Sequence, residues 1–129
     1  MAPEVVNSNQ KDYIQLTRVG DVIIMFPSSE IENLPPNLIE PAAQIALSSL
    51  KSAAISNLIV DLSQVRFFGS EFIAFLLRCH LILKKSGNEL VLAGVNDRIR
   101  ELLRQTALDT IWAIYKTRAE AMEAVGSSD

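Results

Sequence analysis

The chain has 129 residues, a length that favours one domain with a continuous core and no need of disulfide bonds. Hydrophobic residues make up 49% and charged residues 21%, which is an ordinary globular composition. The formal net charge of -3 argues against a nucleic-acid partner, because nucleic-acid-binding surfaces are usually basic. The single cysteine excludes an internal disulfide and fits a reducing compartment, so we expect a cytoplasmic protein.

Residues 1–11 are polar and lack the basic start and apolar run of a signal peptide, which predicts a flexible tail. The longest apolar stretch, Phe72–Leu83, is interrupted by Arg78 and His80. It falls well short of the ~20 residues that a membrane-spanning helix needs, so we expect no membrane association. The expected organisation is one domain over residues 12–126, followed by a short carboxy-terminal tail at 127–129.

The first half of the domain predicts a β-hairpin followed by a helix. Apolar and polar residues alternate over Tyr13–Val19, which is typical of a half-buried strand. Gly20 and Asp21 predict a tight turn, and Val22–Phe26 predicts the second strand of a hairpin. Apolar residues at helical spacing then predict a helix between about Leu38 and Ala53.

Strands and helices alternate through the rest of the chain. The expected strands are Asn57–Val60, which ends at Asp61, then Glu89–Ala93 and Ile111–Tyr115. The helix expected over Ser70–Ser86 is buried on more than one face. Asn96 or Asp97 caps the next helix, and Thr117 caps the last one with Glu120 as its capping box. This order predicts an α/β fold with a mixed sheet, whose central strands are parallel and covered by helices.

A polar corner, Gly69-Ser70-Glu71, separates the strand that ends at Asp61 from the apolar helix. Ser70 is a suitable N-cap, and Glu71 then lies in the first turn, where the helix dipole favours a negative charge by about 0.3–1 kcal/mol. These residues make a good helix start in any case, but helix N-termini also hold phosphate groups. The corner is therefore the candidate functional site.

The sequence contains no convincing catalytic or metal-binding pattern. Cys79 and His80 are neighbours on a helix and point about 100° apart, so they do not form a nucleophile–base pair. One cysteine and one histidine argue against a zinc site, and glycine-rich phosphate loops are absent. Glu30 and Glu32 flank Ile31, where two carboxylates are more typical of a solvated loop than of a catalytic pair. We expect no enzymatic activity, no metal and no cofactor.

Several motifs resemble the STAS domain of anti-sigma factor antagonists. The motifs are Asp61-Leu62-Ser63-x-Val65-x-Phe67 before the serine-containing corner, Gly87–Val95, Ile99–Leu103, Thr106–Asp109, and Ser29–Glu32 where the family often has Gly-Glu-Leu-Asp. The resemblance covers about Tyr13 to Val125. It implies a STAS-like mixed sheet of four or five strands with about four helices, opening with a β-hairpin.

The resemblance also implies a bacterial regulator of transcription without catalytic activity. In this family the domain binds an anti-sigma factor that is a serine kinase, and phosphorylation of a serine at the start of the second helix breaks the complex. The usual corner reads Asp-Ser-Ser-Gly, and the matching residues are Gly69, Ser70, Glu71 and Phe72. Glu71 therefore occupies the position of the phosphoacceptor serine. Glutamate carries one negative charge and phosphoserine about -1.5 to -2, so we hypothesise that Glu71 is a permanent, partial phosphate mimic.

These matches define the predicted partner-binding surface, which comprises Glu30, Glu32, Gly69, Ser70, Glu71 and Phe72. Ser70 matches the first serine of the family corner and is the remaining candidate for phosphorylation. Phe72 replaces a glycine and is expected to change the contact surface. Ala107 also stands where the family usually has glycine, which costs about 1 kcal/mol if the backbone there has positive φ. We expect a monomer or a weak dimer.

Three functional readings remain open at this point. Within the STAS reading, the protein either still answers to a kinase or has diverged into a signalling assembly without the phosphorylation switch. A phosphate-receiver domain that uses Asp61 is the alternative from another class, although Mg²⁺ binding there needs a carboxylate pair after the first strand. A hydrolase that uses Ser70 needs a base nearby, and His80 lies ~15 Å further along the same helix.

Overall fold

The structure is a computed structural model that describes residues 4–5, 13–33, 37, 41, 44, 48 and 57–126. Its centre is a six-stranded sheet in which the strands follow one another in chain order. The strands are β1 (Glu4–Val5), β2 (Ile14–Val19), β3 (Val22–Pro27), β4 (Asn57–Asp61), β5 (Leu90–Ala93) and β6 (Ile114–Tyr115). β1, β2 and β3 are antiparallel, whereas β3 to β6 run parallel, which confirms the predicted mixed sheet.

The predicted hairpin is β2–β3, with Val19 opposite Val22 across the turn. Gly20 has a φ of 64° in that turn, a conformation that glycine adopts without strain. The sheet has one strand more than the four or five predicted, because Glu4–Val5 pairs with Thr17 and Arg18. This short strand lies within the predicted tail and satisfies part of the backbone at the β2 edge.

The helical elements are η1 (Ser29–Asn33), α2 (Ser70–Lys85), α3 (Asp97–Gln105), η2 (Leu108–Thr110) and α4 (Arg118–Val125). The helix predicted between Leu38 and Ala53 lies mostly outside the described residues. Pro41, Gln44 and Ser48 are described there, and each is helical and exposed. No helix in the described parts of the chain is long and apolar enough to cross a membrane.

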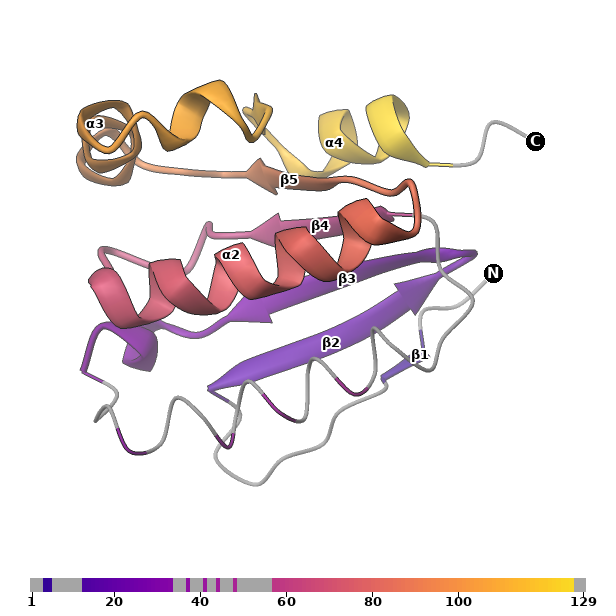
Figure 1. Cartoon of the computed structure of the whole chain (residues 1–129), viewed down its shortest axis with the longest axis horizontal. Coiled ribbons are helices and arrows are strands. Elements are labelled where there is room, and N and C mark those ends of the chain that lie inside the picture. Colours follow the sequence, from indigo (N-terminus) through magenta and orange to yellow (C-terminus); the bar gives the residue numbers. More distant parts are fainter. Residues whose placement is uncertain are drawn as a thin grey trace.

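Helices pack on both faces of the sheet, with α2 running across one face (Figure 1). The core on the α2 side includes Leu58 and Val60 of β4 and Leu90 and Leu92 of β5. The smaller core on the other face includes Ile59, Val91 and Ala121, the last of which belongs to α4. The apolar residues of β4 are therefore shared between the two faces, as expected for a central strand.

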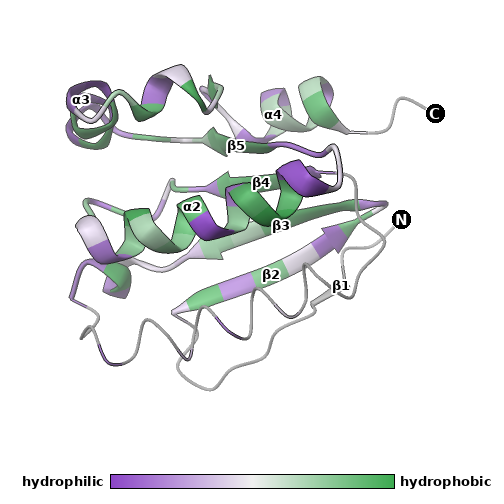
Figure 2. Cartoon of the chain, in the orientation of Figure 1, coloured by the Kyte–Doolittle hydropathy of each residue, from purple (hydrophilic) through white to green (hydrophobic). Residues whose placement is uncertain are grey.

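The fully buried side chains of α2 lie on one side of the helix, and Ile73, Leu77 and Ile82 are partly buried against the same core, whereas burial on more than one face was predicted. Its buried side chains recur at helical spacing and are Phe72, Phe75, Leu76, Cys79 and Leu83. Ala74 is exposed and Leu81 is 59% exposed, and Figure 2 shows apolar colour along much of the helix. Burial removes the Cys79 thiolate from water and raises the pKa of the thiol to about 12.

Two of the predicted helix starts are confirmed. The side chain of Asn96 caps α3 by accepting the Ile99 N–H at 2.8 Å. The Thr117 hydroxyl caps α4 by accepting the Glu120 N–H at 3.1 Å. The Glu120 carboxylate accepts the N–H of Lys116 instead of that of Thr117, so the capping box is displaced by one residue.

The strand predicted over Ile111–Tyr115 is shortened to Ile114–Tyr115, because the chain before it continues as a helical turn. Ala107 has a φ of 60° and a ψ of 15°, and η2 follows it directly. The N–H groups of Ile111 and Trp112 both donate to the Leu108 carbonyl at 3.1 Å. This turn buries the Trp112 ring, whose Nε1 donates to His80 Nδ1 at 3.3 Å.

Candidate functional site

The corner is held by apolar anchors on both sides. The segment from Leu62 to Gly69 joins β4 to α2, and Leu62, Val65 and Phe68 along it are buried. The N-cap of α2 is Gly69, which has an extended backbone, and the cap makes no side-chain hydrogen bond. The prediction that Ser70 caps the helix is therefore wrong, because Ser70 is already the first helical residue.

The predicted site residues of the corner divide between surface and core. Gly69, Ser70 and Glu71 are exposed at the start of α2. Phe72 is only 2% exposed, and its ring lies 5.1 Å from that of Phe68 and 5.6 Å from that of Phe75. The expected contribution of Phe72 to the contact surface is therefore wrong. Its ring anchors the first turn of α2 and so fixes the direction of the two polar residues before it.

The two predicted glutamates lie in η1, and one of them reaches the β4–α2 connection. A Glu32 carboxylate oxygen lies 3.7 Å from a guanidinium nitrogen of Arg66, whose side chain is 78% exposed. The same oxygen is buried and has no hydrogen-bond partner in the described part of the protein. Glu30 is exposed, and its N–H donates to the Ser28 hydroxyl at 3.1 Å. The structure thus brings Glu32 to the connection that precedes the corner.

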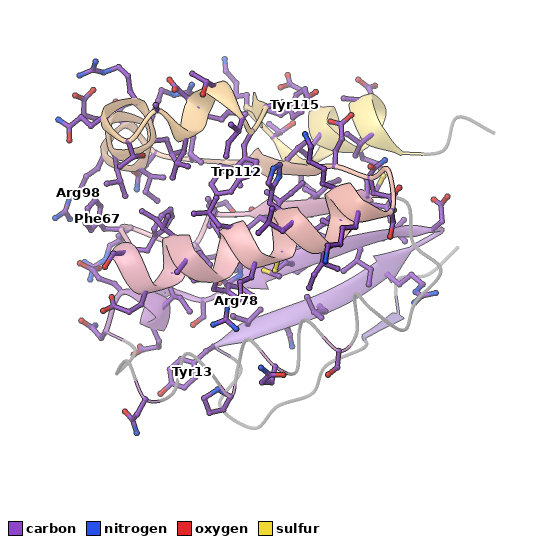
Figure 3. The ribbon with its side chains drawn as sticks, viewed as in Figure 1. Tyr13, Phe67, Arg78, Arg98, Trp112 and Tyr115 are labelled. Atoms are coloured by element: carbon purple, nitrogen blue, oxygen red, sulfur yellow. The ribbon has the colours of Figure 1, made fainter. Side chains whose placement is uncertain are left out.

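Two sets of contacts beside the corner were not predicted from the sequence, one made by Asn96 and the other between Arg98 and Phe67. The Asn96 side-chain amide donates to the Val65 and Arg66 carbonyls at 3.3 and 3.0 Å, which ties the start of α3 to the β4–α2 connection. The Arg98 guanidinium carbon lies 4.1 Å from the centre of the Phe67 ring, and Figure 3 shows these two side chains together. The sequence carries no local signal for this contact, because Phe67 and Arg98 lie far apart along the chain.

The geometry gives no support to hydrolysis at Ser70. His80 Nδ1 accepts the Trp112 indole N–H and so faces the η2–β6 segment. In the described ranges, no group of three or more His, Cys, Asp or Glu residues is arranged to hold a metal ion. Ser70 thus has none of the neighbours that activate a serine nucleophile among the residues described.

Asp61 is unsuited to the role of a phosphate receiver. It is 4% exposed, and its two carboxylate oxygens accept from the Ser63 N–H at 2.9 Å and the Arg118 guanidinium at 2.7 Å. Arg118 also lies 5.2 Å from the centre of the Phe26 ring, so the ion pair is packed between β3, β4 and α4. Receiver domains have a parallel sheet with strand order 2-1-3-4-5, whereas this sheet runs in chain order with an antiparallel edge.

The family comparison agrees with this architecture. A family model for the STAS domain matches residues 13–121. The chain belongs to the STAS domain family. An anti-sigma-factor antagonist (STAS) domain protein from Planctomyces limnophilus is 29% identical, with a TM-score of 0.78 over 88% of this chain and 98% of its own. No curated protein sequence matches the chain significantly.

Two more distant solved structures share the fold. The Bacillus cell fate determinant SpoIIAA in its phosphorylated form is 15% identical, with a TM-score of 0.67 over 86% of this chain and 97% of its own. A serine-to-glutamate variant of RsbS from Moorella thermoacetica is 15% identical, with a TM-score of 0.69 over 84% of this chain and 92% of its own. These likenesses confirm the predicted STAS fold.

Proposed function

We propose that this STAS domain is a non-catalytic regulatory module that binds a signalling protein in the bacterial cytoplasm. The contact lies on the corner surface, which we define as Glu30, Glu32, Gly69, Ser70 and Glu71. The partner is an anti-sigma factor with serine kinase character or a related signalling protein. The observation that carries this proposal is the start of α2, where two polar residues are exposed directly beside an aromatic anchor. Such a rigid, solvent-facing helix start lowers the cost of ordering a binding surface.

Glu71 supplies a fixed negative charge at this helix start. It lies in the first turn of α2, where the helix dipole stabilises an anion. A phosphoserine would add a larger charge and three acceptor oxygens at the same place. We infer that Glu71 holds the corner surface in a state similar to the phosphorylated form of an anti-sigma factor antagonist, so the partner of the wild type is a related signalling protein adapted to this charge, and the kinase binds only when the charge is removed. The solved structures of a phosphorylated SpoIIAA and of a serine-to-glutamate RsbS variant support this inference, because the fold accommodates both groups.

The alternative within this proposal is a second phosphorylation site at Ser70. Its side chain is exposed, and it makes no capping hydrogen bond that a kinase would have to break. A phosphate on Ser70 would lie beside the Glu71 carboxylate, and the two like charges would repel each other. This repulsion favours a fixed charge at Glu71 over reversible phosphorylation at Ser70.

A capture experiment tests the proposal. Wild-type protein, Glu71→Ser and Glu71→Gln serve as baits in lysate of the source organism, with Glu123→Ser as the matched control on the exposed side of α4. We expect Glu71→Ser to retain an anti-sigma factor kinase that the wild type and Glu123→Ser do not, and we expect purified kinase with ATP to phosphorylate Glu71→Ser alone. Capture of one and the same partner by all baits would show that Glu71 is not a switch. Phosphorylation of the wild type at Ser70 would instead establish the alternative.

A further inference from the structure

Two exposed arginine side chains, Arg66 and Arg98, lie beside the corner surface. Arg98 is exposed, and in the described ranges it makes no ion pair, only the contact with the Phe67 ring. Arg66 forms an ion pair with Glu32 at 3.7 Å, longer than a hydrogen bond, and its side chain is 78% exposed. Because exposed ion pairs of this kind are weak, both guanidinium groups are accessible to a partner.

Two other arginines, Arg104 and Arg118, are closely paired with carboxylates. Arg104 makes a two-nitrogen contact with the Glu101 carboxylate one turn away on α3. Arg118 is bonded to the buried carboxylate of Asp61. In these two cases the guanidinium group already makes a short hydrogen bond to a carboxylate of the protein, which makes it less available to a partner than Arg66 or Arg98.

The framework beneath Arg66 and Arg98 is fixed by contacts between distant segments. Asn96 bonds two carbonyls of the β4–α2 connection through its amide nitrogen and caps α3 through its amide oxygen. Phe67 supports the Arg98 guanidinium from below at 4.1 Å. A long cationic side chain normally loses rotamer freedom on binding, and this support removes part of that cost beforehand.

We propose that Arg66, Phe67 and Arg98 form an arginine platform that binds an acidic segment of the partner protein. This inference rests on the proposed function, because it assigns the platform to the partner of the adjacent corner surface. Arginine and aromatic residues are enriched among the residues that carry most of the binding energy at interfaces. Arginine also recognises carboxylates with two parallel hydrogen bonds, which suits a partner rich in Asp or Glu.

The first test uses a defined probe, a hexaglutamate peptide, and the full chain labelled for NMR. We expect side-chain and backbone shifts concentrated at Arg66, Phe67 and Arg98, and we expect Arg98→Gln to lose them. Arg100→Gln, an exposed arginine two residues away on α3, is the matched control and should retain them. Shifts that are absent, or that concentrate at other arginines, would overturn the platform. Hexalysine should give no shifts at these residues.

The second test separates the platform from the proposed function. The partner captured by Glu71→Ser is titrated against that bait with and without Arg98→Gln. We expect a loss of affinity of about tenfold or more, which corresponds to ~1.4 kcal/mol, and about unchanged affinity with Arg100→Gln. If Glu71 governs capture but Arg98→Gln has no effect, the platform fails while the proposed function stands. If neither position alters binding, both fail.

Discussion

Replacement of Ala107 by glycine should stabilise the protein. Ala107 has a φ of 60° and a ψ of 15°, a left-handed conformation that costs an alanine about 1–2 kcal/mol. The conformation is imposed from both sides, because its N–H donates to the Arg104 carbonyl at 3.1 Å and its carbonyl accepts the Thr110 N–H at 3.2 Å. The methyl group is exposed, so its removal loses little packing. Glycine gains chain entropy in the unfolded state worth about 0.4–1 kcal/mol, which leaves a net stabilisation of about 0.5–1 kcal/mol.

Urea unfolding with a shared m value measures this change, and Ala74→Gly supplies the matched control. Ala74 is also exposed but lies within α2, so the same chemical change should destabilise by about 1 kcal/mol. The two variants should therefore differ by about 1.5–2 kcal/mol in opposite directions from the wild type. A loss of stability in Ala107→Gly as large as that in Ala74→Gly would refute the argument that backbone strain is stored at this turn.

Two further predictions concern the buried Asp61 carboxylate and the buried Cys79 thiol. Arg118→Met should destabilise the protein by about 1–3 kcal/mol, because it leaves the buried Asp61 carboxylate with the Ser63 N–H as its remaining partner. In a double-mutant cycle, Arg118→Met combined with Asp61→Asn should lose less stability than the sum of the two single losses. Additive losses would contradict a stabilising ion pair. Stability should also fall as pH rises above about 9, because the Cys79 thiol ionises at its ordinary pKa of 9.0 when unfolded but only at about 12 when folded. Unfolding then releases a proton, so the free energy of unfolding should fall by up to ~1.4 kcal/mol per pH unit because of this thiol. An equal fall with pH in Cys79→Ala would exclude the thiol as the cause.

Local patterns predicted much of the fold. The alternation in β2, the turn at Gly20, and the caps at Asn96 and Thr117 each depend on residues close together in the chain, and all were predicted. The errors arise where tertiary contacts outweigh local preference. Ile111 and its neighbours are apolar and suggest a strand, yet burial of Trp112 against His80 holds this segment in a turn. The two-residue strand β1 carries no periodic signal of its own and exists through pairing with β2.

The sequence predicted the location of the candidate site, but not all of the contacts that surround it. Its exposed residues Ser70 and Glu71 followed from the position of a polar corner before an apolar helix. The burial of Phe72 was also present in the sequence, because Phe72, Phe75, Leu76 and Cys79 recur at helical spacing on one side of α2. The resemblance drew attention to Phe72 as a departure from a family glycine, and that comparison obscured its place in the core. The packing of Arg98 on Phe67 had no local signal, since it depends on the approach of α3 to the β4–α2 connection.

The burial of Phe72 changes how the charge at the corner should be understood. A glycine in its place, as in the usual family corner, would leave the first turn of α2 without the aromatic contacts to Phe68 and Phe75. A first turn without these contacts is held less firmly by packing. Here the ring fixes the turn, and Glu71 beside it carries a charge that no phosphatase can remove. A permanent charge needs no mobile corner, so the two departures from the family pattern are consistent with each other. The buried Phe72 ring and the fixed charge of Glu71 both favour a surface with one binding state over a surface that alternates between two.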